Sequence, residues 1–226
     1  MPTETKRRVV RTLADQLRRL GNIPAYRILW HPFPGTATEA DVLRLHYGPD
    51  NLSVELVDGI LVEKAMGTRE AFMQAELIAL LKNFVSPRKL GLVAASDMLA
   101  RVLSTQIRMP DLSFTTWARL PSADAHLKPI ADWTPDLCVE VLSESNTRRE
   151  MQRKRQDYFR GGAKLVWEFH PVEETVTVYE LDPRHGFVLT KEDTLTGGDV
   201  LPGFKLILGE FFAMPEFQPR TPVQAG

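Results

Sequence analysis

The sequence contains little of what several protein classes depend on. A single cysteine, Cys138, stands among 226 residues, which excludes an internal disulfide and is compatible with a reducing compartment. No apolar run reaches the length of a transmembrane helix, and neither a signal peptide nor an internal repeat is recognisable. These absences predict a cytoplasmic protein that has no membrane partner.

A strong charge of one sign is also lacking, as are the familiar catalytic signatures. The formal net charge is −1, so no overall field draws the chain to nucleic acid, and any basic surface must be local. The five histidines never stand at i, i+4, and no cysteine pair accompanies them, which argues against a structural zinc site. A Walker-type loop, a G-x-G-x-x-G turn and a G-x-S-x-G elbow are all missing.

The length and composition predict one domain with an N-terminal extension. Hydrophobic residues make up 43% of the chain, which is enough for a core. Residues 1–38 are expected to form an amphipathic helix, ending near Gly21, and a linker arm rich in Pro and Gly. Arginines of this helix could touch a phosphate backbone, although a solvated face is the simpler explanation. Residues 39–215 are expected to form the main domain, and residues 216–226 a flexible tail.

The remaining pattern mixes helices and strands. A short helix is predicted over residues 38–46, and Asp58-Gly59 between apolar runs indicates a hairpin over residues 52–62. A longer helix is predicted over residues 69–84, with Ser86-Pro87 as its end. One or two strands are predicted over residues 92–104, and further strands over residues 113–117, 175–181 and 187–190. Turns are predicted at residues 196–199 and 202–203, and a closing segment over residues 206–212.

An apolar strand with one carboxylate stands in the middle of the chain. Residues 137–142 read LCVEVL, a run typical of a strand that is buried on both faces, yet Glu140 interrupts it. A bare carboxylate in such a place costs several kcal/mol unless it is paired, protonated or bound to a metal. The simpler explanation is an edge strand on which Glu140 faces water.

The helix that follows carries a lysine on its apolar face. It is predicted to begin at a capping box, TRRE at residues 147–150, and to end at a double glycine. Met151, Lys154 and Tyr158 share the face that points at the sheet. Lys154 could therefore reach Glu140 or a group that Glu140 holds, or it could extend its ammonium to solvent. The two charged residues in one strand–helix unit favour a site.

A second carboxylate is placed to join Glu140. Asp111 begins the preceding strand, and if the two strands are neighbours their carboxylates can converge on one hard cation such as Mg²⁺. Lys154 could then orient or deprotonate a water, or balance charge that develops on a phosphate. Asp136 lies roughly 13 Å from Glu140 along the same strand, too far to share a metal.

Three further carboxylates have simpler explanations. Glu55 and Glu63 lie on the arms of the predicted hairpin, where either could face a site, but solvated strand positions are commoner. Glu70 stands in the first turn of the predicted helix over residues 69–84, where the helix dipole favours a negative charge. The residues alone therefore assign none of the three to a site.

Several segments form a recognisable pattern when they are taken together. They are ELVDGILVEKAMG at residues 55–67, MPDLSF at 109–114, PDLCVEVLSESNT at 135–147, KLVWEFHP at 164–171 and TLTGGDVLPGF at 194–204. Over about residues 35–215 the chain resembles the αβββαβ core of the PD-(D/E)XK nuclease superfamily, and more closely the Uma family of restriction-endonuclease-like proteins. The predicted fold class is therefore α/β (α+β), a restriction-endonuclease-like core with a mixed central sheet, an N-terminal helical extension and C-terminal β-hairpin elements.

The resemblance implies a metal-dependent nuclease and assigns roles to individual residues. Asp111 and Glu140 match the two motif carboxylates. A D/E-x-K triplet would place a lysine at position 142, where Leu142 stands, and Lys154 looks like a lysine that has migrated to the following helix. Many relatives carry a histidine where the first helix begins, and Glu70 looks like its acidic substitute and a third metal ligand.

The predicted function is a Mg²⁺-dependent endonuclease, with Mn²⁺ as the alternative cofactor, that hydrolyses phosphodiester bonds of DNA. The predicted catalytic residues are Asp111, Glu140 and Lys154, the metal ligands are Asp111, Glu140 and Glu70, and the nucleic-acid contacts are Arg148, Arg149, Arg153 and Arg155. Two alternatives stay open. One is a non-catalytic nucleic-acid-binding module with the same fold, and the other is a structural homodimer built on the β-rich C-terminal half.

Overall fold

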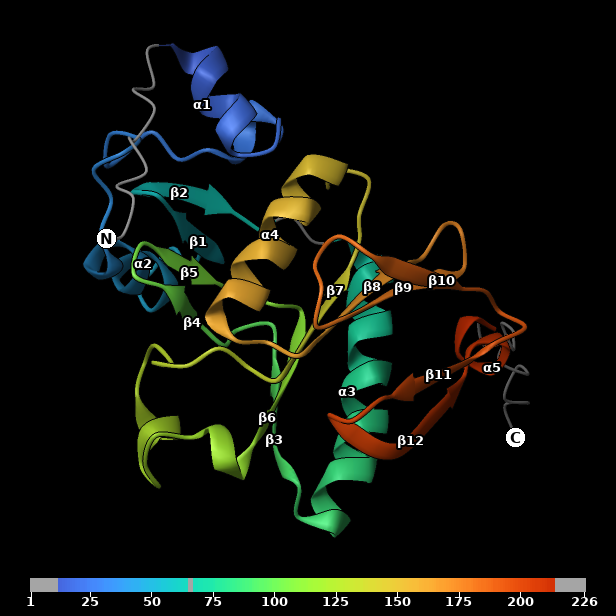
Figure 1. Cartoon of the computed structure of the whole chain (residues 1–226). Helices are drawn as coiled ribbons and strands as arrows, with labels where there is room; N and C mark the ends of the chain where they lie inside the picture. The colour runs from blue at the N-terminus through green and yellow to red at the C-terminus, as the bar shows by residue number, and fades with distance from the viewer. Residues whose placement is uncertain (1–11, 65–66, 214–226) are drawn as a thin grey trace, which may run out of the picture.

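A mixed six-stranded sheet lies at the centre of this computed structural model, which describes residues 12–64 and 67–213 (Figure 1). The sheet contains β3 (Gly91–Ala95), β6 (Leu112–Thr116), β7 (Leu137–Val141), β8 (Leu165–His170), β9 (Thr175–Glu180) and β10 (Gly186–Leu189). Its strand order is β10-β9-β8-β7-β6-β3. Strands β7 and β8 are parallel, and the other neighbours are antiparallel. The predicted fold class, with a mixed central sheet, is confirmed.

Two helices cover opposite faces of this sheet, α3 (Thr68–Arg88) and α4 (Arg148–Gly161) (Figure 1). Successive side chains of a strand point to opposite faces. Along β7, Leu137 and Val139 therefore join the core under α3, whereas Cys138 and Glu140 face α4 and meet its Tyr158. An apolar strand can carry a carboxylate here because only one of its faces meets the main hydrophobic core.

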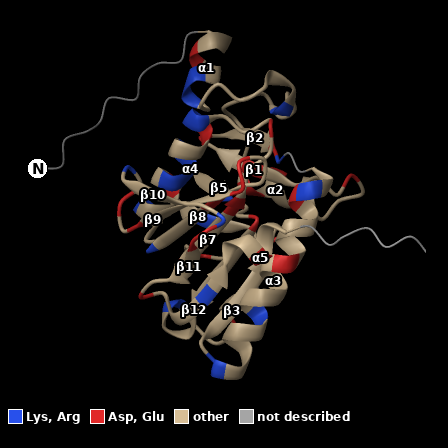
Figure 2. Cartoon of the chain, turned by 90° about the vertical axis from the view of Figure 1, so that its right-hand side faces the viewer, with Lys and Arg blue, Asp and Glu red and all other residues tan. Residues whose placement is uncertain are grey.

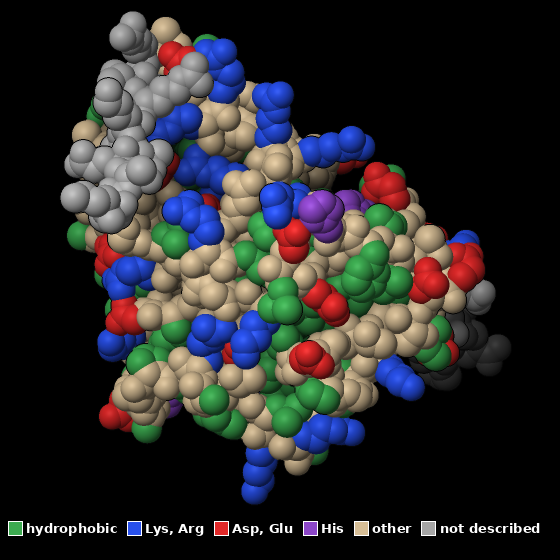
Figure 3. Space-filling model, in the orientation of Figure 1, with side chains coloured by type: hydrophobic (Ala, Val, Ile, Leu, Met, Phe, Trp, Pro, Cys, Tyr) green, Lys and Arg blue, Asp and Glu red, His purple; other side chains and the backbone are tan. Residues whose placement is uncertain are grey.

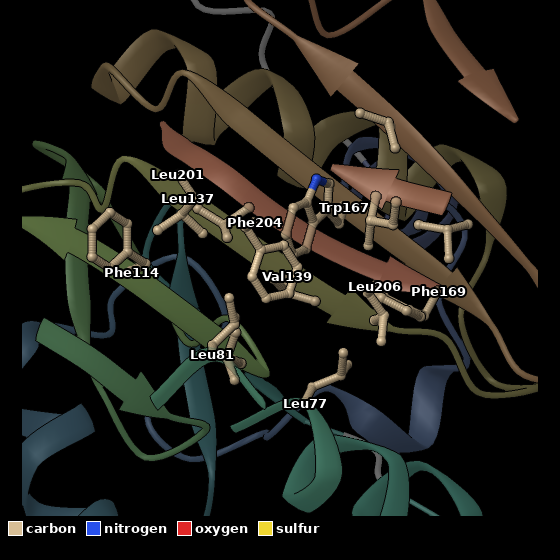
Figure 4. Packing of buried hydrophobic residues seen from close by; sticks show 14 of the residues in the cluster. Leu77, Leu81, Phe114, Leu137, Val139, Trp167, Phe169, Leu201, Phe204 and Leu206 are labelled. Atoms are coloured by element: carbon tan, nitrogen blue, oxygen red, sulfur yellow. The ribbon is translucent and has the colours of Figure 1, made fainter. Parts of the chain in front are cut away.

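The main core lies between α3 and the sheet, and Figure 4 shows its centre. Trp167 and Phe204 stack with their ring centroids 5.8 Å apart. Phe204 belongs to the hairpin of β11 (Thr194–Gly197) and β12 (Leu201–Ile207), which closes the core together with α5 (Leu208–Phe212). The buried residues labelled in Figure 4 are Leu77, Leu81, Phe114, Leu137, Val139, Trp167, Phe169, Leu201, Phe204 and Leu206.

A second sheet of four strands stands beside the first (Figure 1). Its strands are β1 (Val54–Val57), β2 (Ile60–Glu63), β4 (Ala100–Leu103) and β5 (Gln106–Arg108), in the order β2-β1-β5-β4. The helix α2 (Glu39–His46) has a capping box at its start and packs on this sheet. The predicted short helix and the hairpin around Asp58-Gly59 are both confirmed.

Residues 92–104, predicted as one or two strands, contain two, β3 and β4, which belong to different sheets. The three-residue strand β5 has no counterpart in the prediction, and the end of α3 differs from it. Helix α3 continues through Ser86-Pro87 and ends at Arg88. The next residue, Lys89, caps the helix in the left-handed conformation, with a φ of 52°. A proline lacks an N–H, but only one helical residue follows Pro87, so little of the helix is interrupted.

The predicted turn at Pro202-Gly203 is wrong, because both residues lie inside β12. The pairing of β12 with β11 shifts there, since Thr196 pairs with Lys205 while Gly197 pairs with Leu201. Gly203 has a φ of 84°, which glycine adopts without a steric penalty. The chain therefore absorbs the break as a bulge within the strand.

The helix α1 (Leu13–Arg19) leads into an arm that packs on the start of α4. Gly21 has a φ of 90°, and a Cβ at this position would lie 2.4 Å from the backbone nitrogen of Glu150. The guanidinium of Arg27 donates to both carboxylate oxygens of Glu150, at 3.1 and 2.9 Å. The arm therefore holds the N-terminal end of α4, the helix that carries Lys154.

Short 3-10 helices span Ala25–Arg27, Trp117–Arg119 and Ala125–Leu127. None of the helices in the described ranges combines the length and the apolar character that a membrane crossing requires. The beginning of the predicted N-terminal helix, before residue 12, and the predicted tail over residues 216–226 lie outside the described residues.

Candidate functional site

A cluster of charged side chains is buried where the two sheets meet α4. No member has a side chain more than 5% exposed, so each charge must be balanced by neighbouring protein groups. Figure 2 shows acidic and basic residues together in the middle of the molecule, near β1, β5 and β7. The members are Glu55 of β1, Lys64 after β2, Arg108 of β5, Asp111 before β6, Glu140 of β7, and Lys154 and Asp157 of α4.

Lys154 lies between two carboxylates. Its Nζ is 2.9 Å from Oε2 of Glu140 and 3.1 Å from Oε1 of Glu55. The hydroxyl of Tyr158 donates to the other oxygen of Glu140, at 2.5 Å. Burial favours the neutral amine, but the charges of Glu140 and Glu55 outweigh it and raise the pKa of Lys154 above its ordinary value. The predicted contact with Glu140 is present, and the lysine is held in its charged form.

Asp111 is joined to the strand that carries Glu140. The backbone N–H of Val141 donates to Oδ2 of Asp111, at 2.6 Å. The Nζ of Lys64 lies 2.6 Å from Oδ1 and also donates to the carbonyl oxygen of Met109, at 2.8 Å. The structure therefore brings three of the predicted site residues, Asp111, Glu140 and Lys154, into one cluster.

Glu140 and Glu55 share Lys154, yet their pKa values move in opposite directions. Burial disfavours the charged form of Glu140, and the nearby charge of Asp111 adds to this, so its pKa rises to about 7 despite Lys154. Burial also disfavours the charged form of Glu55, but the charges of Lys154 and Arg108 outweigh it and lower its pKa to about 2. Glu140 is thus the one of these two that takes up a proton first.

Replacing Glu140 with glutamine is expected to change how stability depends on pH. The folded pKa of about 7 exceeds the ordinary value of 4.5, so between these values the folded state holds a proton that the unfolded state releases. The free energy of unfolding of the wild type therefore falls as pH rises through this window, by up to about 3 kcal/mol at ~1.4 kcal/mol per pKa unit.

Glu140→Gln has no such proton to hold. In urea titrations the unfolding free energy of the wild type minus that of the variant should therefore decrease between pH 4.5 and pH 7. A difference that stays constant across this window would show that the carboxyl of Glu140 titrates alike in the folded and unfolded chains.

Glu55, Arg108 and Asp157 connect the smaller sheet to α4. Arg108 lies 2.8 Å from Oε2 of Glu55 and 2.5 Å from Oδ2 of Asp157. The N–H of Met109 donates to Glu55, at 3.1 Å. Sequence reasoning left Glu55 open and missed Lys64, Arg108 and Asp157. The available signal was the pattern V-E-L-V, in which Glu55 interrupts an apolar run as Glu140 does.

Glu70 does not join the cluster. It is the third residue of α3, and its carboxylate turns back to the space that a Cβ of Gly67 would fill at the helix start. Within residues 12–64 and 67–213, no group of three or more His, Cys, Asp or Glu side chains is arranged to hold a metal ion. The predicted three-ligand set of Asp111, Glu140 and Glu70 is therefore not formed, and Glu70 keeps the position that the helix dipole favours.

The described residues also form a hollow of about 1070 Å³, whose wall includes no member of the cluster. It lies at the carboxyl ends of β7 and β8, between the first turns of α3 and α4. Leu142, two residues beyond Glu140, and Gly67, three residues beyond Lys64, belong to its wall. The charged and aromatic side chains of the wall are Arg69, Glu70, Glu144, Arg148, Arg155, Glu168, His170, Glu173 and Tyr179.

The predicted nucleic-acid contacts fall into two kinds. Arg148 and Arg149 are exposed at the start of α4, and Arg148 lines the hollow. Arg153 and Arg155 instead bind protein groups: Arg153 lies 2.8 Å from Asp58, and Arg155 lies 2.7 Å from Glu168. Figure 3 shows basic side chains gathered over α1 and the start of α4, so the surface has a local basic region despite the balanced total.

Comparison with known proteins gives matches of two kinds. The family Uma2, described as putative restriction endonuclease, matches residues 40–209. The crystal structure of a putative nuclease belonging to DUF820 from Anabaena variabilis ATCC 29413 is similar, with a TM-score of 0.63 and 19% identity over 70% of this chain and 89% of that chain. At this identity the likeness concerns the fold. Comparison with the curated proteins gives no significant match.

Proposed function

Because the chain belongs to the Uma2 family of putative restriction endonucleases, we propose that it is a metal-dependent endonuclease that hydrolyses phosphodiester bonds of DNA. One observation carries the proposal. Asp111 and Glu140 come from neighbouring strands into one buried cluster, linked by the N–H of Val141, and Lys154 lies against Glu140. A buried set of carboxylates is typical of a catalytic site, because burying it solely for stability is unfavourable.

The two carboxylates fit a hard divalent cation. Mg²⁺ prefers oxygen ligands and binds through one or two carboxylates, keeping several waters, and Mn²⁺ accepts similar ligands. Asp111 and Glu140 would hold it, because a carboxylate offers about four lone-pair sites and each of their oxygens has one described hydrogen-bond or ion-pair partner. When bound, such a cation lowers the pKa of a water and neutralises charge on the phosphate.

The residues of the chain have separate tasks in this proposal. Lys154 is charged, so it does not take the proton from the attacking water. It holds Glu140 in place and favours the ionised carboxylate that a cation needs, and the Tyr158 hydroxyl orients the other oxygen. Arg148, on the wall of the hollow, would contact a phosphate of the substrate.

The decisive experiment offers the whole protein plasmid DNA, single-stranded DNA and RNA with Mg²⁺, with Mn²⁺ and with EDTA. Cleavage of DNA that requires a divalent cation and stops with EDTA is the expected result. Binding without cleavage of any substrate would favour the non-catalytic nucleic-acid-binding module, and neither binding nor cleavage would favour a structural protein. Cleavage of RNA alone would show that the substrate is RNA and not DNA.

The double variant Arg148→Ala/Arg149→Ala is expected to bind DNA more weakly and with less dependence on salt. Each phosphate contact contributes about 0.9 to the slope of log K against log salt, so loss of two contacts should reduce the slope by about 1.8. Fluorescence anisotropy in EDTA measures binding without cleavage. Arg160→Ala, which removes an exposed arginine at the other end of α4, is the matched control and should leave the slope unchanged.

A further inference from the structure

Lys64 lies against Asp111, one of the two carboxylates proposed to hold the cation. Its Nζ lies 2.6 Å from Oδ1 of Asp111, and Oδ2 already accepts the N–H of Val141. A divalent ion and an ammonium group on the same buried oxygen would repel each other strongly, because little solvent screens them. Binding a cation at Asp111 therefore requires a change at Lys64.

The charge of the cluster leads to the same conclusion. With every group ionised, the four carboxylates of Glu55, Asp111, Glu140 and Asp157 exceed the three cations of Lys64, Arg108 and Lys154 by one charge. Addition of a divalent ion would leave one excess positive charge. Departure of one ammonium restores neutrality, the arrangement that costs least in a buried site.

Lys64 is the cation that can leave. Lys154 contacts two carboxylates from the middle of a helix, and Arg108 contacts Glu55 and Asp157 from within a sheet. Lys64 stands just beyond the end of β2 and forms an ion pair with Asp111. Its release breaks this ion pair and one hydrogen bond, that to the carbonyl of Met109.

We propose that Lys64 is an exchangeable counter-ion, which neutralises Asp111 in the metal-free protein and leaves it when a divalent cation binds. The inference rests on the proposed metal-dependent function and adds the event that accompanies loading of the site. Lys64 thereby sets the affinity for the cation, and the ion pair that it forms keeps Asp111 balanced until the cation arrives.

Calorimetric titration of the whole protein with MgCl₂ tests this at pH 8. Lys64→Gln is expected to bind Mg²⁺ at least about tenfold more tightly than the wild type, because a unit charge next to the ion has been removed. In the Asp111→Asn background the same change should have no effect. Lys128→Gln, which removes an exposed lysine 2.6 Å from Asp132, is the control and should bind like the wild type.

Equal or weaker binding by Lys64→Gln would overturn the inference while leaving the metal site in place. Tighter binding that persists in the Asp111→Asn background would overturn it too, since the effect would not pass through Asp111. Absence of Mg²⁺ binding in both the wild type and Lys64→Gln would overturn the proposed metal dependence as well.

A measurement on the wild type avoids any loss of folding in the variant. Lysines are acetylated briefly with and without MgCl₂ and located by mass spectrometry. Modification of Lys64 should increase with Mg²⁺, whereas Lys154, held between Glu140 and Glu55, should stay protected in both conditions. Equal modification of Lys64 in both conditions would contradict its release.

Discussion

Asp111→Asn is expected to lower the rate of DNA cleavage at least about a thousandfold while the protein stays folded. Loss of the ligand charge removes several kcal/mol of stabilisation from the transition state, and each ~1.4 kcal/mol corresponds to a factor of ten. The asparagine carbonyl can still accept the N–H of Val141, and Lys64 keeps the carbonyl of Met109. Single-turnover cleavage at saturating Mg²⁺ measures the effect.

Asp136→Asn provides the matched control for this prediction. Asp136, like Asp111, is a buried aspartate that directly precedes a strand of the central sheet and accepts a backbone N–H, here from Thr116, but it pairs with Arg119 away from the cluster. This variant should lose stability and keep its cleavage rate at temperatures where it is folded. Similar losses of activity in both variants would show that the substitution of Asp111 acts through folding. Full activity of Asp111→Asn would show that Asp111 is not part of the catalytic site.

Lys154→Met is expected to lower the free energy of unfolding by about 3–5 kcal/mol at pH 8, since a buried carboxylate loses its counter-charge. Both Glu140 and Glu55 contact this ammonium, and Glu55 alone keeps a second cation, Arg108. Urea unfolding followed by circular dichroism measures the loss. Lys164→Met is the control, because it removes an exposed lysine that lies 3.4 Å from Asp136. It should lower the free energy of unfolding by at most about 1 kcal/mol.

A second substitution separates charge from packing. In Lys154→Met/Glu140→Gln the unpaired charge is gone, so part of the lost stability should return. If the double variant is no more stable than Lys154→Met, the lysine contributes through its aliphatic stem instead.

The strand–helix unit could be predicted because its exceptions stand out against strong patterns. Glu140 breaks an apolar strand and Lys154 breaks an apolar helix face, and one pairs with the other as expected. The hairpin around Asp58-Gly59 is equally local, since the turn residues are adjacent in the sequence. The order of helices and strands then sufficed for the fold class.

The sequence did not suffice to assign the remaining members to the cluster, because their positions depend on contacts between distant segments. Glu55 also interrupts an apolar run, but it lies on an antiparallel hairpin, where one face is often in water, and its contact with Lys154 forms only when α4 packs there. Lys64 follows a strand end and reaches Asp111 across the chain. Arg108 lies on β5, a strand of three residues that is too short to show a period.

The structure also shows why Glu140 has a lysine partner although position 142 is a leucine. The D/E-x-K spacing would place a lysine there, whereas Leu142 lines the hollow and its N–H donates to the carbonyl of Phe169. Lys154 instead reaches Glu140 from α4, with its Nζ 2.9 Å from the carboxylate. A charge next to Glu140 is therefore supplied from a different backbone position.

The close contact between Gly21 and the start of α4 restricts which sequence changes the protein can accept. A side chain at Gly21 would push against the backbone at Glu150, and Glu150 in turn holds Arg27. The carbonyl oxygen of Gly21 also accepts a hydrogen bond from the hydroxyl of Thr147, so these four residues form one continuous contact between the arm and the start of α4. Substitutions in an arm that precedes the family match, which begins at residue 40, are therefore expected to affect the position of Lys154.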